Sequence, residues 1–253
     1  MEEFTKISVT PLNMDSVMDT EFPDGISFFS SFLSYYAREV LEVGGEAFVS
    51  KDAENRINGL FIYDQFEKTG TVFTNSRAVF NLFYGFRQHR FLFSEVMTEF
   101  ENEPFDIYSM NLANYIGDHR FRHEVEMAEE NEIEEIERFM AMVNPGMNPG
   151  WVRVAIHNGD RCFISRLGDE IAGLGWLSKV NGVGRLHSLF VSPKFRGMGI
   201  GTDLLNARLF WLRASGTKWV FSEISQFNVP SARIAAKGGM KKTGVIYLYF
   251  RKV

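Results

Sequence analysis

The stretch "VSPKFRGMGIGTDLL", residues 191–205, carries glycine at positions 197, 199 and 201. The apolar run "RLHSLFV" before it predicts a strand, and the apolar spacing after it predicts a helix. A helix N-terminus presents backbone N–H groups without intrahelical partners and a partial positive charge. Glycines let such a backbone approach a ligand closely. The stretch therefore predicts a cradle for a phosphate or pyrophosphate, with Lys194 and Arg196 adding positive charge beside it.

Other designs for phosphate binding fit this stretch poorly. A P-loop needs a Gly-Lys-Ser/Thr sequence, whereas Gly201 is followed directly by Thr202. A Rossmann fingerprint needs its glycines soon after the strand, but "SPKFR" intervenes, and too few strands follow Glu223 to complete a dinucleotide domain. Glycines that serve only tight turns or helix packing remain the structural alternative.

The same stretch resembles the acyl-CoA signature of the GNAT superfamily of N-acetyltransferases, whose pattern is Arg/Gln-x-x-Gly-x-Gly/Ala. A second block, "NVPSARIAAKGGM" at residues 228–240, is similar to the family's Asn-x-x-Ser/Ala…Lys-x-Gly-Phe/Met segment. The resemblance covers residues 121–253, which we expect to form the catalytic domain. Residues 1–120 contain the strand-like runs "AFVSKD" and "GLFIYD" but no Arg-x-x-Gly-x-Gly. They resemble a degenerate GNAT-like repeat, as in tandem GNAT proteins.

The remaining segments predict an α/β protein of the mixed α+β kind, with helices packed on a mixed sheet. Helices are expected over residues 24–45, 78–100, 129–143, 200–215 and 230–238, and residues 144–151 are expected to form a turn-rich loop. Strands are expected over residues 46–52, 59–66, 70–76, 105–113, 122–128, 161–168, 171–179, 184–192, 218–225 and 244–252.

The resemblance implies a binding site for acetyl-CoA, which serves as a co-substrate. His119 and His123 could share a strand face, but without a nearby Cys or a His-rich cluster we expect no metal. In such enzymes the pantetheine arm lies along the fourth strand, and the acyl thioester lies where the fourth and fifth strands splay apart. The implied cofactor-binding residues are Leu189, Phe190, Val191, Arg196, Gly197, Met198, Gly199, Ile200, Gly201, Thr202 and Asn228.

The reaction implied by the resemblance is direct attack of a primary amine on the thioester in a ternary complex. An alkylammonium with a pKa near 10 is only about 0.1% neutral at pH 7, a handicap of roughly 4 kcal/mol that a general base can offset. Two residues match positions of catalytic bases in the family. Glu223 matches a glutamate on the fifth strand, and His187 matches one of a histidine pair on the fourth strand, where Arg185 takes the other place. A salt bridge for Glu223 and a hydrogen-bonded structural role for His187 remain open.

One position departs from the family pattern. Ala235 stands where many members carry a tyrosine that protonates the leaving thiolate, so the sequence assigns no general acid. The alternative function is therefore a CoA-binding regulatory or interaction module without turnover. Cys162 lies in an apolar run and is expected to be a core residue rather than an acyl carrier.

Composition narrows the partners. Residues 1–137 carry 27 acidic and 10 basic side chains, whereas residues 138–253 carry 5 acidic and 17 basic ones, which favours an anionic ligand for the second half. Without Lys/Arg-rich runs, and with an isoelectric point near 5.6, we expect no nucleic-acid partner. One cysteine and the absence of a long apolar run predict a cytoplasmic protein with no membrane contact.

The sequence leaves the acceptor open. A small-molecule amine and a protein N-terminus are both compatible with it, as is a homodimer, and the preferred acyl chain is not encoded. The loop at 144–151, with Trp151, occupies the region where family members build the acceptor pocket. We expect residues 1–120 to help form that pocket or an interface.

Overall fold

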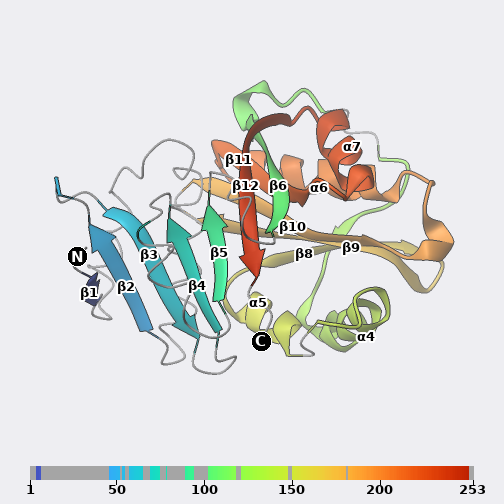
Figure 1. Ribbon diagram of the computed structural model, residues 1–253. Coiled ribbons are helices and arrows are strands. Elements are labelled where there is room, and N and C mark those ends of the chain that lie inside the picture. The colour runs from blue at the N-terminus through green and yellow to red at the C-terminus, as the bar shows by residue number, and fades with distance from the viewer. Residues whose placement is uncertain are drawn as a thin grey trace. The chain divides into compact units, whose positions relative to one another are not determined.

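The protein is described by a computed structural model, shown in Figure 1. It describes residues 4–6, 46–51, 53–54, 57–64, 69–74, 78, 89–93, 102–117, 121–147, 150–180 and 182–250. The chain forms two compact units, Met1–Asp106 with Gly244–Val253, and Ile107–Thr243. The division falls inside two strands, β6 (Asn102–Asn111) and β12 (Lys241–Phe250), each of which contributes to both units.

The second unit is built on a mixed sheet. Its strands are β7 (Glu126–Met127), β8 (Arg161–Leu167), β9 (Glu170–Val180), β10 (Val183–Val191) and β11 (Trp219–Ser225), and β6 lies next to β11. The pairs from β7 to β10 are antiparallel, whereas β10 and β11 are parallel. This is the mixed sheet expected from the sequence.

Helices cover both faces of this sheet. Figure 1 shows α6 (Ile200–Ala214) and α7 (Val229–Lys237) on one face, and α4 (Ile133–Val143) and α5 (Trp151–His157) on the other. The short 3-10 helices are η1 (Leu112–Asn114), η2 (Glu130–Glu132) and η3 (Pro193–Phe195). The apolar stripe of α6 is fully buried in the core on its face: Ile200, Leu204, Leu205, Leu209 and Leu212. On the opposite face, Ile136 and Met140 of α4 pack with Trp176 of β9. Burial of these two apolar faces stabilises the unit.

The first unit repeats the same strand pattern. Its strands are β1 (Phe4–Lys6), β2 (Glu46–Lys51), β3 (Ile57–Asp64), β4 (Thr69–Thr74) and β5 (His89–Phe93), and β12 lies next to β5. The pairs from β1 to β4 are antiparallel, and β4 pairs with β5 in parallel. Each unit therefore has four antiparallel strands followed by one parallel strand.

Most predicted elements of the described residues are confirmed, with three corrections. The helix expected over residues 78–100 is wrong at β5, because pairing with β4 and β12 overrides the local helical spacing. The strand expected over residues 122–128 is reduced to β7. Helix α5 was not expected; it buries only Val152 and Ala155, an apolar stripe too short to be recognised. The helix expected over residues 24–45 lies outside the described residues.

Candidate functional site

Glycine is required at residues 197, 199 and 201 for different physical reasons. Gly197 and Gly199 have φ values of 81° and 99°, which residues with a Cβ rarely adopt. Gly201 lies inside the helix, and a Cβ there would come within 2.8 Å of Cδ1 of Ile234 in α7. The first two glycines therefore shape the turn, and the third brings α7 against α6.

The turn leaves a row of amides available to a ligand. The carbonyl of Gly199 accepts the first two helical hydrogen bonds, from the amides of Thr202 (2.9 Å) and Asp203 (3.1 Å). Within the described part of the chain, none of the amides of residues 197–201 has a hydrogen-bond partner. Unpaired N–H groups at the start of a helix of 15 residues attract an anion.

A segment before β7 adds a cation that sequence reasoning missed. A Cβ on Gly199 would lie 3.7 Å from Cδ of Arg122 and 3.9 Å from its Nη1, so this arginine flanks the turn. Its neighbour His123 is held to the first turn of α6, because Oδ2 of the buried Asp203 accepts from the His123 amide (3.1 Å) and lies 2.8 Å from Nδ1. No motif links Arg122 to residues some 80 positions later, so only the fold reveals it.

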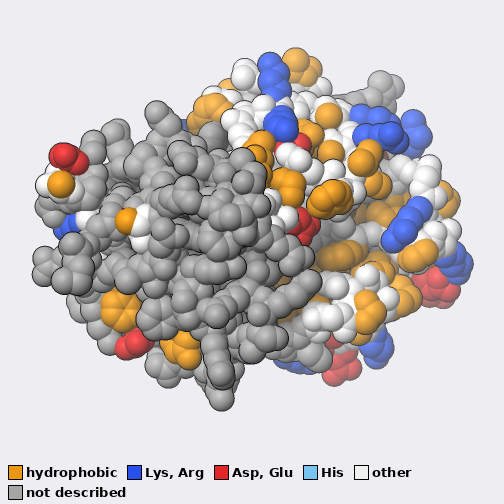
Figure 2. Space-filling model, viewed as in Figure 1, with side chains coloured by type: hydrophobic (Ala, Val, Ile, Leu, Met, Phe, Trp, Pro, Cys, Tyr) orange, Lys and Arg blue, Asp and Glu red, His pale blue; other side chains and the backbone are white. Residues whose placement is uncertain are grey.

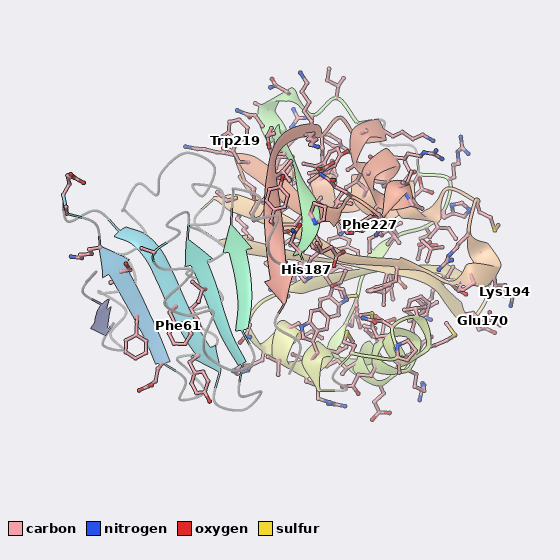
Figure 3. The ribbon with its side chains drawn as sticks, in the orientation of Figure 1. Phe61, Glu170, His187, Lys194, Trp219 and Phe227 are labelled. Carbon is pink, nitrogen blue, oxygen red and sulfur yellow. The ribbon has the colours of Figure 1, made fainter. Side chains whose placement is uncertain are left out.

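Basic side chains surround this turn. Figure 2 shows Lys and Arg side chains gathered over α7 and the neighbouring turn that holds η3. Arg196 is exposed and its Nε donates to the carbonyl of Val191 (3.3 Å), which closes the turn. Lys194 pairs with Glu170 at 2.8 Å on the surface (Figure 3). Some of the basic side chains of the second half therefore lie near the amides.

Next to the turn, two strands part. The parallel pairing of β10 with β11 covers only Val183↔Trp219, Gly184↔Val220 and Arg185↔Phe221, although both strands continue beyond it. From Leu186 to Val191, the edge of β10 that faces β11 has no strand partner among the described residues. The splay implied by the family resemblance is present at the position expected.

A β-bulge lies where the strands part. Ser188 and Leu189 of β10 stand opposite the single residue Gly175 of β9, between the pairs His187↔Trp176 and Phe190↔Leu174. Ser188 has a φ of 48° and is the one non-glycine residue with a positive φ among those described. The bulge reverses the alternation of side chains, so that Leu189 and Val191 pack toward α6 whereas Phe190 packs toward α4 and α5.

A buried arginine of α6 supports the bulge from the face of the sheet on which α6 packs. Arg208 is 1% exposed, and its Nη1 donates to the carbonyls of Trp176 (2.8 Å) and His187 (3.4 Å). It fits because residue 175 is glycine: a Cβ there would lie 2.8 Å from Cζ of Arg208. Burial lowers the pKa of Arg208 to about 10, so the guanidinium stays charged at neutral pH.

On the α4–α5 face, His187 stands in a polar network (Figure 3). Its Nε2 lies 3.1 Å from Oγ of Ser178 and 3.3 Å from Oδ2 of Asp160, and its Nδ1 lies 3.3 Å from Oγ of Ser188. The side chain is 9% exposed, and burial, opposed by the hydrogen bond to Asp160, lowers the pKa of His187. The imidazole is therefore neutral at pH 7 and able to accept a proton.

Glu223 is already engaged by a cation. Nε of Arg185 donates to both its carboxylate oxygens, at 2.9 and 3.1 Å; Arg185 is in the last pair between β10 and β11, and Glu223 lies two positions beyond its partner Phe221. The salt bridge that the sequence left open is present. His187 and Glu223 share one face of the sheet, and Trp151 of α5 lies against the His187 ring, with centroids 6.0 Å apart.

Other predicted residues have structural surroundings. The side chain of Asn228 caps α7, since its Oδ1 accepts from the amide of Ser231 (3.2 Å). Ala235 is 4% exposed and packs in the core with residues of α6. Cys162 is buried, which raises the pKa of its thiol far above the ordinary value, as expected of a core residue. The described residues contain no group of three or more His, Cys, Asp or Glu that could hold a metal ion.

Comparisons with known proteins agree with this arrangement. Residues 120–240 match the sequence model of the Acetyltransferase (GNAT) family. No curated protein matches the chain in sequence. Among solved structures, a Drosophila protein that is 10% identical has a TM-score of 0.68, covering 99% of this chain and 99% of its own. A GCN5-related N-acetyltransferase from Sphaerobacter thermophilus is 12% identical, with a TM-score of 0.67 over 98% of this chain and 95% of its own. A tandem GNAT protein from the clavulanic acid biosynthesis pathway is 12% identical, with a TM-score of 0.59 over 99% and 98% of the two chains.

At these identities the structural likeness shows the fold, while the sequence match identifies the family. Together they define a domain of the acetyltransferase class at residues 120–240, with the fold of that class. Residues 120–240 thus carry the sequence pattern of the Acetyltransferase (GNAT) family, and the resemblance found in the sequence is confirmed for this segment. None of the helices in the described ranges is long and apolar enough to cross a membrane.

Proposed function

We propose that this protein is an acetyl-CoA-dependent N-acetyltransferase that acts on a primary amine by direct attack. When bound, acetyl-CoA would supply the acetyl group as an activated thioester. The amides of residues 197–201 and the cations of Arg122 and Arg196 suit its diphosphate, since they combine unpaired donors with positive charge. The unpaired edge of β10 at Leu189–Val191 suits a chain of amides such as pantetheine.

One observation carries the proposal. The bare N-terminus of α6 and the unpaired edge of β10 are connected by the eight residues 192–199, so that one elongated ligand can engage both. A phosphate site alone would not need the parted strands, and a strand gap alone would not need the glycines.

We assign the proton acceptor to His187 rather than to Glu223. Both carboxylate oxygens of Glu223 face Arg185, which holds the carboxylate in place, whereas Nδ1 of the neutral His187 faces the hydroxyl of Ser188. Asn228 supports the site by fixing the start of α7.

The first unit supports a tandem origin. Its strand pattern repeats that of the second unit, but its sequence lacks an Arg-x-x-Gly-x-Gly turn after β4. We propose that it is a degenerate repeat which does not itself bind acetyl-CoA, so that one molecule of protein binds one molecule of acetyl-CoA.

Two measurements test the function. Isothermal titration calorimetry is expected to show one binding site for acetyl-CoA and CoA, and weaker binding of adenosine 3′,5′-bisphosphate, which lacks the pantetheine arm. A panel of polyamines, amino acids, aminoglycosides and peptides with a free N-terminus is then assayed by release of free thiol. Binding without any acetylation would favour the alternative, a CoA-binding module without turnover, which the buried Ala235 at the position of the usual tyrosine supports. No heat of binding with any of these ligands would refute the proposal.

A further inference from the structure

Three side chains form a continuous chain of polar contacts that ends in the strand gap. Oδ2 of Asp160 lies 3.3 Å from Nε2 of His187, and Nδ1 of the same ring lies 3.3 Å from Oγ of Ser188. Asp160 is 4% exposed and follows α5, whereas the other two residues are on β10. An acid, an imidazole and a hydroxyl are thus connected from the interior outward.

The outer member is placed where a reaction would occur. Ser188 is three positions beyond Arg185, the last residue of β10 that pairs with β11, and so lies in the opened part of the gap. Its positive φ turns its side chain toward His187, while its neighbour Leu189 packs toward α6. Such backbone strain persists only where the surroundings hold it. Here Arg208 does so, because its Nη1 binds the carbonyl of His187, directly before Ser188.

The contacts also select a tautomer of His187. A carboxylate only accepts hydrogen bonds, so Nε2, which faces Asp160, carries the proton. Nδ1 is then the acceptor and takes the hydrogen bond from the Ser188 hydroxyl. Ser178 lies 3.1 Å from the same Nε2 and shares that side of the ring.

We propose that Ser188, His187 and Asp160 form a proton relay for the acceptor amine, with Ser188 in contact with the amine. The inference rests on the proposed N-acetyltransfer. As the amine attacks, a C–N bond to the acetyl carbon forms and the C–S bond of the thioester breaks, so that CoA would leave as its thiolate. The N–H bond of the amine breaks and an O–H bond forms at Ser188, while the Ser188 proton passes to Nδ1 of His187. The imidazolium so formed is stabilised by Asp160, which is a positioning residue, and later returns its proton to solvent.

The charges around His187 suit this role. Arg185 on β10 disfavours the imidazolium, whereas Asp160 before β8 and Glu223 on β11 favour it. Arg208 of α6 reaches only the backbone carbonyl of His187. The lowered pKa of His187 keeps the ring neutral before the reaction, and the carboxylates of Asp160 and Glu223 stabilise the imidazolium afterwards.

Kinetics of two variants test the relay. Ser188→Gly removes the hydroxyl but suits the positive φ, so the turn is kept; kcat should fall about 10²-fold, with the KM for acetyl-CoA unchanged. Ser165→Ala is the matched control, because its buried hydroxyl on β8 has no hydrogen-bond partner in the described structure, and wild-type rates are expected. Asp160→Asn should lower kcat and move the acidic limb of the pH–rate profile to lower pH, since the imidazolium loses its carboxylate. A wild-type kcat in Ser188→Gly, or an unmoved limb in Asp160→Asn, would overturn the relay.

A second readout needs no turnover and separates this inference from the proposed function. Nitrogen–proton NMR of the ligand-free wild-type protein should show His187, assigned with His187→Gln, as the Nε2–H tautomer. Its pKa should fall in Asp160→Asn. A proton on Nδ1, or a His187 titration unaffected by Asp160→Asn, would refute the relay even if the enzyme acetylates amines. Conversely, the expected tautomer in a protein that acetylates no amine would refute the proposed function while leaving the chain of contacts established.

Discussion

A methyl group added at Gly197 tests the anion cradle most directly. The residue has a φ of 81°, and a Cβ built there has nothing within 4 Å, so Gly197→Ala introduces backbone strain without a clash. An L-residue in this conformation costs about 1–2 kcal/mol. For a chain of this size the melting temperature should fall by about 2–8 °C.

Gly216 offers a matched control at the opposite end of the same helix. Its φ is 77°, and a Cβ there also has nothing within 4 Å. Gly216→Ala should therefore lose the same stability, about 1–2 kcal/mol, but it leaves the amides before α6 untouched. Comparing the two variants separates the effect of backbone strain on stability from its effect on ligand binding.

The two variants should differ in affinity for CoA. Strain that the turn keeps in free Gly197→Ala lowers the melting temperature, whereas strain that it loses by relaxing must be restored on binding. In the second case the affinity for CoA falls by about 5–30-fold for 1–2 kcal/mol. Calorimetric titration should give wild-type affinity for Gly216→Ala and reduced affinity for Gly197→Ala. A wild-type affinity together with a wild-type melting temperature in Gly197→Ala would refute the reasoning, because the strain would then appear in neither folding nor binding. Equal melting temperatures in all three would show that the left-handed backbone is not required.

Three further outcomes follow from buried groups. Gly175→Ala should lower the free energy of unfolding by about 1–3 kcal/mol in urea titrations, because its Cβ meets the buried guanidinium of Arg208; an unchanged midpoint would contradict this packing. Because the folded pKa of His187 lies below its unfolded value near 6.5, the unfolded chain binds the proton first, and stability should fall as the pH drops from 6.5 toward that folded pKa. His187→Gln should show less of this loss when unfolding is measured at pH 7.5 and 5.5, and an identical pH dependence would exclude the effect. Cys162 should react with a thiol reagent only after unfolding, and rapid labelling of the native protein would disprove its burial.

The sequence predicted the elements that short-range patterns encode. The five apolar residues of α6 recur at helical spacing and are all buried. Gly197 and Gly199 before them have the positive φ values of the turn that the glycine-rich stretch predicted. These features depend on residues close together in the chain. Helix spacing and left-handed turns are therefore readable without a structure.

The sequence could not predict contacts between distant segments. Arg122 reaches Gly199 only because His123 is bound by Asp203, and Asp160 reaches His187 only through the register of the sheet. β5 was mistaken for part of a helix because its partners, β4 and β12, are brought to it by the fold. A bulge leaves no mark in composition, so nothing in "HSLFV" indicated the reversal at Ser188.

The placement of β12 has a consequence for biosynthesis. β5 pairs with β12, whose residues follow the whole second unit in the sequence, whereas β6, which follows β5 directly, lies beside β11. During translation, all the other strands of the first unit thus leave the ribosome well before β12, the strand that covers the exposed edge of β5. Until then, β5 presents open backbone groups to any passing polypeptide. Translation speed and chaperone access should therefore affect the yield of native protein more strongly than in a chain whose halves mature one after the other.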